Sequence, residues 1–464
     1  MTLTQRSRWA RGRVTALLTT ALLVPLIAPT AAVAQPAALT VDSYVLPPGA
    51  ASPSLQHLRS PQEAPELARH ADQSATEGIR SPLELVGPAA SYAPRAAQPS
   101  AVAPPQRPAL SAAAISYPEP AHTMTAEECR AGLGTDNKFY VKSRFAVCSG
   151  AAFTQRWSRN RQIVGESQFV VLAVGTIAKS SRDMKVQYYF TNMQQTGTTG
   201  TGALMITPKI TVPQKWPASA QVTQGGSIPG PQSWQVLAAQ NPATFLHSVS
   251  VSAGQGTGVD DLVFAVYQPT IELAPPPGWE MQGALKGDLF FLAPRWDTAT
   301  YVTRAGAAVF SYLATLQYSS TAGTPEKAVA DHIKTAYTKP ATTKPTNAAK
   351  KLPGQSADNP LHRLFHDKTR REKNRSEAIR NCRQYWGTNY AAGGKECDEF
   401  PFAVTYEGCA QALPTYEPSK PKNNYSVLPL PKADNGAAGT LLSGFLLKNR
   451  LVDGQDDAFI VQIT

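Results

Sequence analysis

The sequence has few charged residues, and it lacks a long apolar run beyond its N-terminus. Charged residues make up 17% of the 464 positions, too small a share for a wholly disordered polyelectrolyte. No stretch after the first segment reaches the roughly 18 apolar residues that a spanning helix needs. We therefore expect folded domains and no stable membrane insertion after that segment is removed. The formal net charge of +11 favours an anionic partner without choosing among nucleic acid, cell wall and lipid.

The first 34 residues contain no acidic side chain and have the parts of an export signal. The positive charge comes from four arginines: Arg6, Arg8, Arg11 and Arg13. An apolar run too short to span a membrane follows, and Ala32 and Ala34 fit the small-residue cleavage rule. The pattern predicts a signal peptide over residues 1–34 and a secreted, extracellular protein.

Residues 35–121 contain no cysteine, phenylalanine or tryptophan, and 35 of these 87 residues are proline or alanine. Such a segment buries too little apolar surface to offset the entropy of an ordered chain. We expect it to be disordered, as a cleaved pro-segment or as a spacer that crosses a cell wall.

Phenylalanine and tryptophan return after Met124, in a region of short strand-like patterns. Residues 168–177 form a β-branched apolar run, and Val186, Tyr188 and Phe190 alternate with polar neighbours. Glycine, proline and aspartate bound similar runs at 262–267 and 288–292.

These runs predict a β-rich, sandwich-like domain over residues 124–320, whose role the sequence does not reveal. Residues 301–317 fit either a strand pair or a closing helix. The domain could bind a cell-wall or protein partner.

A second compact domain is expected after a linker. Residues 338–357 are rich in proline, threonine and lysine and have no aromatic residue, which is typical of an exposed linker. Residues 358–464 begin with a basic, helical pattern and end in an apolar strand. The sequence thus predicts a multidomain protein, with a β-rich middle domain and a smaller α+β domain at its C-terminus.

All five cysteines follow the predicted signal, as expected for an oxidising compartment. Cys129 and Cys148 could close one loop at the start of the β-rich region. Cys382 could pair with Cys397, leaving Cys409 free, or with Cys409 itself. Sequence alone leaves this choice open.

Three familiar catalytic patterns are absent: His-Glu-x-x-His, Gly-x-Ser-x-Gly and paired Cys-x-x-Cys. Their absence disfavours the common zinc proteases and serine hydrolases. Instead, Asp398, Glu399 and Glu407 lie within ten residues around a proline-containing turn. Carboxylates can bind Mg²⁺ or Mn²⁺ and can deprotonate an attacking water, as phosphodiester hydrolysis requires. A solvated acidic turn is the alternative.

A basic segment precedes this acidic turn. Residues 363–383 contain eight basic and three acidic side chains, so positive charge is concentrated where a polyanionic substrate would need it. A solvated helix face is the competing interpretation. His362 and His366 are spaced to share a helix face, where they could ligate a metal, contact phosphate or be structural.

The segment CDEFPFAVTYEG at residues 397–408 resembles the CDEYPFA-x-x-x-EG core of the NucA/NucB-type deoxyribonucleases, which are secreted bacterial DNA nucleases. The resemblance extends over residues 358–464, through PLHRL at 360–364, KNR at 373–375 and DNGAAG at 434–439. It implies a small α+β domain related to the ββα-metal nucleases.

The resemblance also implies site residues. Asp398 would be the base that activates water, Glu399 would support the base or the metal, and Glu407 and Asn435 would bind Mg²⁺ or Mn²⁺. The expected DNA-backbone contacts are His362, Arg363, Arg371, Lys373 and Arg375. One departure concerns residues 443–445, where some members of the family have a Gly-Asn-Gln-like stretch and this chain has Ser-Gly-Phe.

The sequence therefore predicts a secreted, metal-dependent DNA endonuclease with little sequence preference, because contacts to the DNA backbone carry no base information. Two other hypotheses stay open. One is a wall-associated binding protein with a degenerate nuclease domain, and the other is an antibacterial nuclease toxin.

Overall fold

The computed structural model describes residues 38–48, 100–102, 115–135, 137–303 and 305–464. The expected signal peptide at 1–34 lies outside these residues. The chain is β-rich and multidomain, and 38% of the described residues are in strands and 18% in helices. The described residues from Ala38 onward belong to one compact unit. None of the helices in the described ranges is long and apolar enough to cross a membrane.

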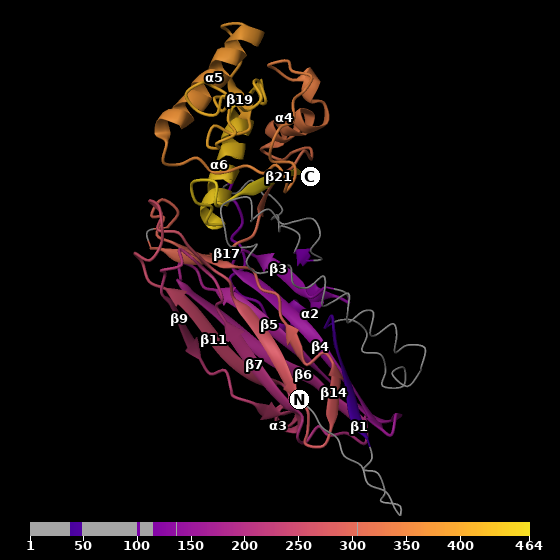
Figure 1. Cartoon of the computed structure of the whole chain (residues 1–464). Helices are drawn as coiled ribbons and strands as arrows, with labels where there is room; N and C mark the ends of the chain where they lie inside the picture. The colour runs from indigo at the N-terminus through magenta and orange to yellow at the C-terminus, as the bar shows by residue number, and fades with distance from the viewer. Residues whose placement is uncertain (1–37, 49–99, 103–114, 136, 304) are drawn as a thin grey trace, which may run out of the picture. The chain divides into compact units, whose positions relative to one another are not determined.

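The largest sheet joins nine strands, of which the central β4, β5 and β6 are long and antiparallel (Figure 1). The path runs β14-β1-β4-β5-β6-β11-β9, and β3 pairs with β4 and β2. The strands are β1 (Leu39–Leu46), β2 (Ser100–Val102), β3 (Phe139–Ser143), β4 (Ala146–Arg159), β5 (Gln162–Ile177), β6 (Asp183–Gly197), β9 (Val222–Gly226), β11 (Ala243–Val251) and β14 (Glu280–Gly283).

Two four-stranded sheets share an apolar core with the large sheet. Phe169 of β5, Ile271 of β13 and Trp296 of β16 are fully buried in this one cluster, as expected for a sandwich-like domain. One small sheet holds β7 (Met205–Thr211), β10 (Gln232–Ser233), β13 (Gln268–Ala274) and β15 (Lys286–Asp288). The other holds β8 (Lys215–Trp216), β12 (Val263–Ala265), β16 (Pro294–Asp297) and β17 (Ala307–Phe310). Two short helices are α2 (Ala126–Leu133) and α3 (Trp234–Ala239).

The described part of the segment expected to be disordered contains two strands, β1 and the short β2. Along its whole length β1 pairs antiparallel with β4, and Val41 and Leu46 are buried. The composition of residues 35–121, averaged over the segment, hides the short run LTVDSYVL, which is rich in β-branched and aromatic residues. The prediction of disorder is therefore wrong for Leu39–Leu46.

The C-terminal domain begins earlier than the sequence indicated. Its core contains β18 (Ala314–Tyr318), which pairs in parallel with β21 (Phe459–Ile463), and the helix α4 (Lys327–Thr338). Residues 301–317 contain strand and no closing helix, but β17 pairs with β16 and β18 with β21, so the two strands do not form the expected pair. Of the strand expected at 288–292, only Asp288 is in β15. The remaining elements are a 3-10 turn (Pro340–Thr342), α5 (Lys368–Trp386), β19 (Lys395–Phe400), β20 (Ser426–Pro431) and α6 (Lys432–Lys448).

Residues 338–357 pack against this domain instead of forming an exposed linker. The amide of Val427 donates to the carbonyl of Lys344 at 2.8 Å, and Leu352 is buried in the core. Lys350 is 4% exposed, and burial lowers its pKa to about 8. The linker prediction is wrong here, because it used only the local composition. The contacts that hold these residues come from partners that are distant in the sequence.

The structure contains two disulfides, Cys129–Cys148 and Cys382–Cys397, and so decides the pairing of Cys382 that the sequence left open. Cys409 is a buried free thiol, so the alternative pairing with Cys382 is not formed.

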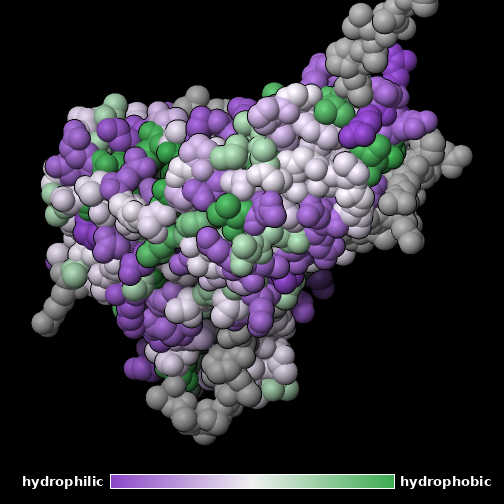
Figure 2. Space-filling view, turned by 90° about the horizontal axis from the view of Figure 1, so that it is seen from below, coloured by the Kyte–Doolittle hydropathy of each residue, from purple (hydrophilic) through white to green (hydrophobic). Residues whose placement is uncertain are grey.

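On the surface, the exposed large apolar side chains are scattered. Figure 2 shows small hydrophobic spots separated by hydrophilic residues on the face that it presents. The exposed residues include Trp216, Val236, Val259 and Leu285. Single exposed apolar residues of this kind do not define a binding face.

Candidate functional site

A two-stranded sheet followed directly by a helix forms the frame of the candidate site. β19 and β20 pair antiparallel, with Asp398 opposite Leu428, and α6 begins at the residue after β20. This is the ββα order that the resemblance implied.

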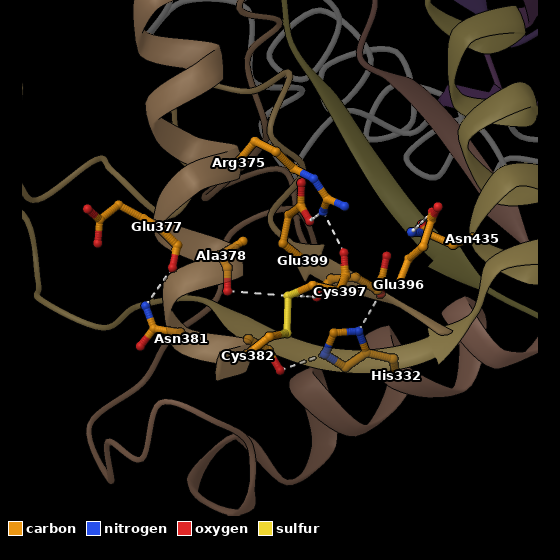
Figure 3. Close-up of a disulfide and its surroundings, with 12 residues drawn as sticks. His332, Arg375, Glu377, Ala378, Asn381, Cys382, Glu396, Cys397, Glu399 and Asn435 are labelled. Atoms are coloured by element: carbon orange, nitrogen blue, oxygen red, sulfur yellow. Dashed lines mark hydrogen bonds and ion pairs between the residues drawn. A yellow bond between two sulfur atoms is a disulfide. The ribbon is translucent and has the colours of Figure 1, made fainter. Parts of the chain in front are cut away.

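Alternation along β19 divides its side chains between two faces. Glu396, Asp398 and Phe400 contact residues of α6 and α4, whereas Cys397 and Glu399 contact α5. Figure 3 shows the second group, with the Cys382–Cys397 disulfide and the Arg375–Glu399 pair between strand and helix. The two neighbouring acids predicted from the sequence therefore have different surroundings.

Asp398 is 6% exposed and is bound to His332 of α4. Its Oδ2 lies 2.5 Å from Nδ1 of His332, and Nε2 of His332 lies 2.7 Å from Oγ of Ser426. A carboxylate that keeps a fixed orientation and little solvation suits a base, because it requires little reorganisation to accept a proton.

Glu399 is buried against α5, where its carboxyl group accepts a hydrogen bond from the guanidinium of Arg375. Burial raises the pKa of Glu399 to about 8, although Arg375 acts in the opposite direction and the neighbouring Asp398 adds to the rise. Arg375 also donates to the carbonyl of Cys397. The pair supports β19 from the face opposite to Asp398.

Glu407 binds His362. Its Oε1 lies 2.8 Å from Nδ1 of His362, and its Oε2 accepts from the backbone amide of the same residue at 3.0 Å. The carboxylate thus fixes the ring of His362, which is 13% exposed.

Asn435, in the first turn of α6, lies beside Glu396. Its Nδ2 donates to Oε2 of Glu396 at 3.5 Å, and Lys432 lies 3.4 Å from the other oxygen of Glu396. The two predicted metal ligands, Glu407 and Asn435, therefore have different partners. Within the described residues, no group of three histidine, cysteine, aspartate or glutamate side chains could hold a metal ion.

The predicted DNA contacts divide into buried and available side chains. Arg363 is 7% exposed, donates to the carbonyl of Leu451 and packs over two aromatic rings, so it serves the fold. Lys373 is 45% and Arg375 37% exposed on α5. Arg371 is partly exposed and lies 5.3 Å from the ring centre of Phe365.

The two spaced histidines do not share a helix face, because α5 starts only at Lys368. His366 lies 3.1 Å from Asp260, while His362 is bound to Glu407.

Residues 443–445, where the sequence departs from the resembled pattern, lie inside α6. Phe445 is fully buried and packs against Phe459 and Tyr117. A side chain at Gly444 would meet Cβ of Tyr117 at 2.8 Å. In this chain the stretch is part of the domain core.

Two polar residues of the site, His332 and Glu396, were not predicted. His332 lies in an amphipathic helical pattern whose apolar residues are buried, and no local signal links it to a partner 66 residues away. Glu396 could have been found from the alternation of β19, which places it on the same face as Asp398.

Comparison with known families agrees with this geometry. Residues 350–461 match the family model described as Deoxyribonuclease NucA/NucB, so the C-terminal segment is a deoxyribonuclease domain of that type. No curated protein and no solved structure matched the chain. The match does not extend to α4 or to the β-rich domain.

Proposed function

We propose that this chain is a secreted endonuclease that hydrolyses DNA phosphodiester bonds with the help of a divalent metal. The observation that carries the proposal is Asp398. It stands on the first strand of a ββα unit, inside a matched deoxyribonuclease domain, and it is held in one orientation.

Asp398 would accept the proton of the water that attacks phosphorus. The basic residues Arg371, Lys373 and Arg375 of α5 would bind phosphates of the DNA backbone. Glu407 would orient His362 for contact with the DNA backbone. Because these contacts do not reach base edges, cleavage would show little sequence preference.

The donors near Asp398 fit a hard cation. Glu396 and Asn435 offer a carboxylate and an amide oxygen on the same side of β19. Mg²⁺ commonly takes only one or two protein ligands and completes its shell with water and substrate phosphate, and Mn²⁺ prefers the same oxygen donors. When bound, the ion would polarise the phosphoryl oxygen and neutralise developing charge. We assign Glu396 and Asn435 as its protein ligands, with Glu407 engaged by His362.

The test is nicking of supercoiled plasmid by the full chain with Mg²⁺, with Mn²⁺ and with EDTA. We expect cleavage with metal, none with EDTA, and no preferred site among the mapped ends. A folded chain that leaves plasmid intact in both metals would contradict the proposal and would favour a binding protein with a degenerate nuclease domain.

A further inference from the structure

The residue that holds Asp398 comes from outside the matched segment. His332 belongs to α4, which ends before residue 350, where the family match begins. It is 3% exposed, on the buried side of the helix together with Val329 and Ile333. An imidazole placed in a core is costly unless both ring nitrogens have partners, and His332 has Asp398 on one side and Ser426 on the other.

The tautomer of His332 follows from what its two partners can do. An ionised Asp398 can only accept, so Nδ1 of His332 is the donor in the 2.5 Å contact with its Oδ2. In the neutral ring, Nε2 then accepts a hydrogen bond from the hydroxyl of Ser426, at 2.7 Å. The carboxylate of Asp398, which can only accept, thus selects the tautomer that donates to it, and the hydroxyl of Ser426 completes the ring's hydrogen bonds by donating to Nε2.

A serine, a histidine and an aspartate joined in this order are also the connectivity of serine hydrolases. Ser426, however, is 0% exposed and lies opposite Phe400 in the β19–β20 pair. No substrate can reach its oxygen, so the chain of hydrogen bonds serves Asp398. The described residues supply a hydrogen bond to Oδ2 of Asp398 and none to its Oδ1, which leaves Oδ1 for a water proton.

We infer that His332 is a positioning residue for the nuclease reaction: with Ser426 behind it, it holds Oδ2 of Asp398 and so aims Oδ1 at the attacking water. This inference rests on the proposed function. It places a residue that serves the site on α4, outside the residues matched by the family model.

Other contacts keep α4 in place when His332 is altered. The amide of Ala328 donates to Oδ2 of Asp434 at 3.2 Å, and the ring of Tyr337 lies edge-on to Phe400 with centres 5.2 Å apart. A substitution at His332 can therefore change the orientation of Asp398 while the helix stays docked.

The test compares two amide substitutions in the full chain. Asparagine places its NH₂ group near the position of Nδ1, so His332→Asn keeps a donor to Asp398. Glutamine reaches the position of Nε2, so His332→Gln keeps the contact to Ser426 and loses the one to Asp398. Lys334→Gln, on the exposed side of α4, is the matched control.

A misplaced catalytic group can cost about 100-fold, so we expect His332→Gln to lower kcat by that order and His332→Asn by about fivefold or less. KM for DNA should stay within about twofold, because the phosphate contacts lie on α5. Should His332→Gln fail to fold, Ser426→Ala tests the same series of hydrogen bonds from Ser426 through His332 to Asp398. We expect this variant to have a lower kcat and an unchanged KM.

Suppose that the unaltered chain cleaves DNA and that Asp398→Asn abolishes cleavage. Equal kcat values for the two amide variants, or an effect on KM alone, would then overturn the positioning role of His332. If the unaltered chain does not cleave, or Asp398→Asn cleaves normally, the proposed function fails and the inference fails with it.

Discussion

At the scale of single residues, burial decides how Glu399 responds to pH. The ordinary pKa of 4.5 is raised to about 8 in the folded chain, mainly by burial. Between these two values the folded protein holds a proton that the unfolded chain has released, so stability falls as pH rises, and the full loss is present above pH 8.

Glu399→Gln should remove this dependence. We expect its stability relative to the unaltered chain to rise by roughly 1.4 kcal/mol per pH unit between about pH 5 and 8. Urea unfolding at intervals across this range measures it, with the exposed Glu372→Gln as control. Parallel stability curves for Glu399→Gln and the unaltered protein would contradict the assignment.

The proposed phosphate contacts of Arg371 and Lys373 are tested at the same scale. Arg371→Gln and Lys373→Gln should each weaken DNA binding and reduce the slope of log K against log salt by roughly 0.9, the value for one phosphate contact. Lys286→Gln, an equal charge change on an exposed residue of β15, should leave the slope unchanged. Fluorescence titration of labelled DNA at several salt concentrations gives the slopes. A salt dependence that neither substitution on α5 changes would show that Arg371 and Lys373 do not contact phosphate.

At the scale of elements, a disulfide connects α5 to the strand that carries Asp398. Replacing Cys382 and Cys397 together by alanine opens a loop with a sequence separation of 15, which should cost about 3 kcal/mol of stability and lower kcat. Replacing Cys129 and Cys148, 19 residues apart, should cost a similar free energy and leave kcat unchanged. Thermal unfolding and plasmid nicking separate the two effects. Equal kcat for both double variants would show that the covalent tie does not support the site.

Elements with a local signal could be predicted, and those that depend on distant partners could not. The β-branched run at 168–177 lies in β5, and the alternation at Val186, Tyr188 and Phe190 matches buried positions of β6. Asp398 was found from a motif, and its position in a ββα unit followed. By contrast, β18, α4 and the supposed linker join the C-terminal core through residues up to 145 positions away, and nothing in their composition announces this.

At the scale of the whole molecule, a buried network of charges links the β-rich domain to the C-terminal domain. Asp457 pairs with Arg144 at 2.8 Å and with Arg295, while Asp297 pairs with Arg295 at 3.1 Å and Arg450 at 2.5 Å. Burial alone would raise the pKa of Asp457, but Arg144 and Arg295 bring it below its ordinary value. The network is thus an ionised one whose members depend on one another.

Removing one charge from this network should lower the free energy of unfolding strongly. Asp457→Asn leaves Arg144 buried without its counter-ion and leaves Arg295 with Asp297 alone, and we expect a loss of about 3–5 kcal/mol. Asp183→Asn, at an exposed position of β6, should change stability by less than about 0.5 kcal/mol. Chemical unfolding of both variants checks the difference, and a loss for Asp457→Asn as small as that of the control would contradict the role of the network.

The same scale governs which part of the chain can act alone. A fragment of residues 351–464 lacks β18, so β21 would lose its only strand partner among the described residues, and α4 would no longer cover Asp398. We expect this fragment to be largely unfolded by circular dichroism and inactive. A folded, active fragment would show that the core can close without β18 and α4.

The most direct test of the account is the cleavage rate of the full chain with Asp398→Asn. Asparagine keeps the size of the side chain and an oxygen for His332, and it cannot accept the water proton. With Asp183→Asn as the folded control, we predict that kcat for plasmid nicking falls by about 10²–10⁴ for Asp398→Asn while its melting temperature stays close to that of the unaltered chain. A folded Asp398→Asn variant that nicks plasmid at the normal rate would contradict the account.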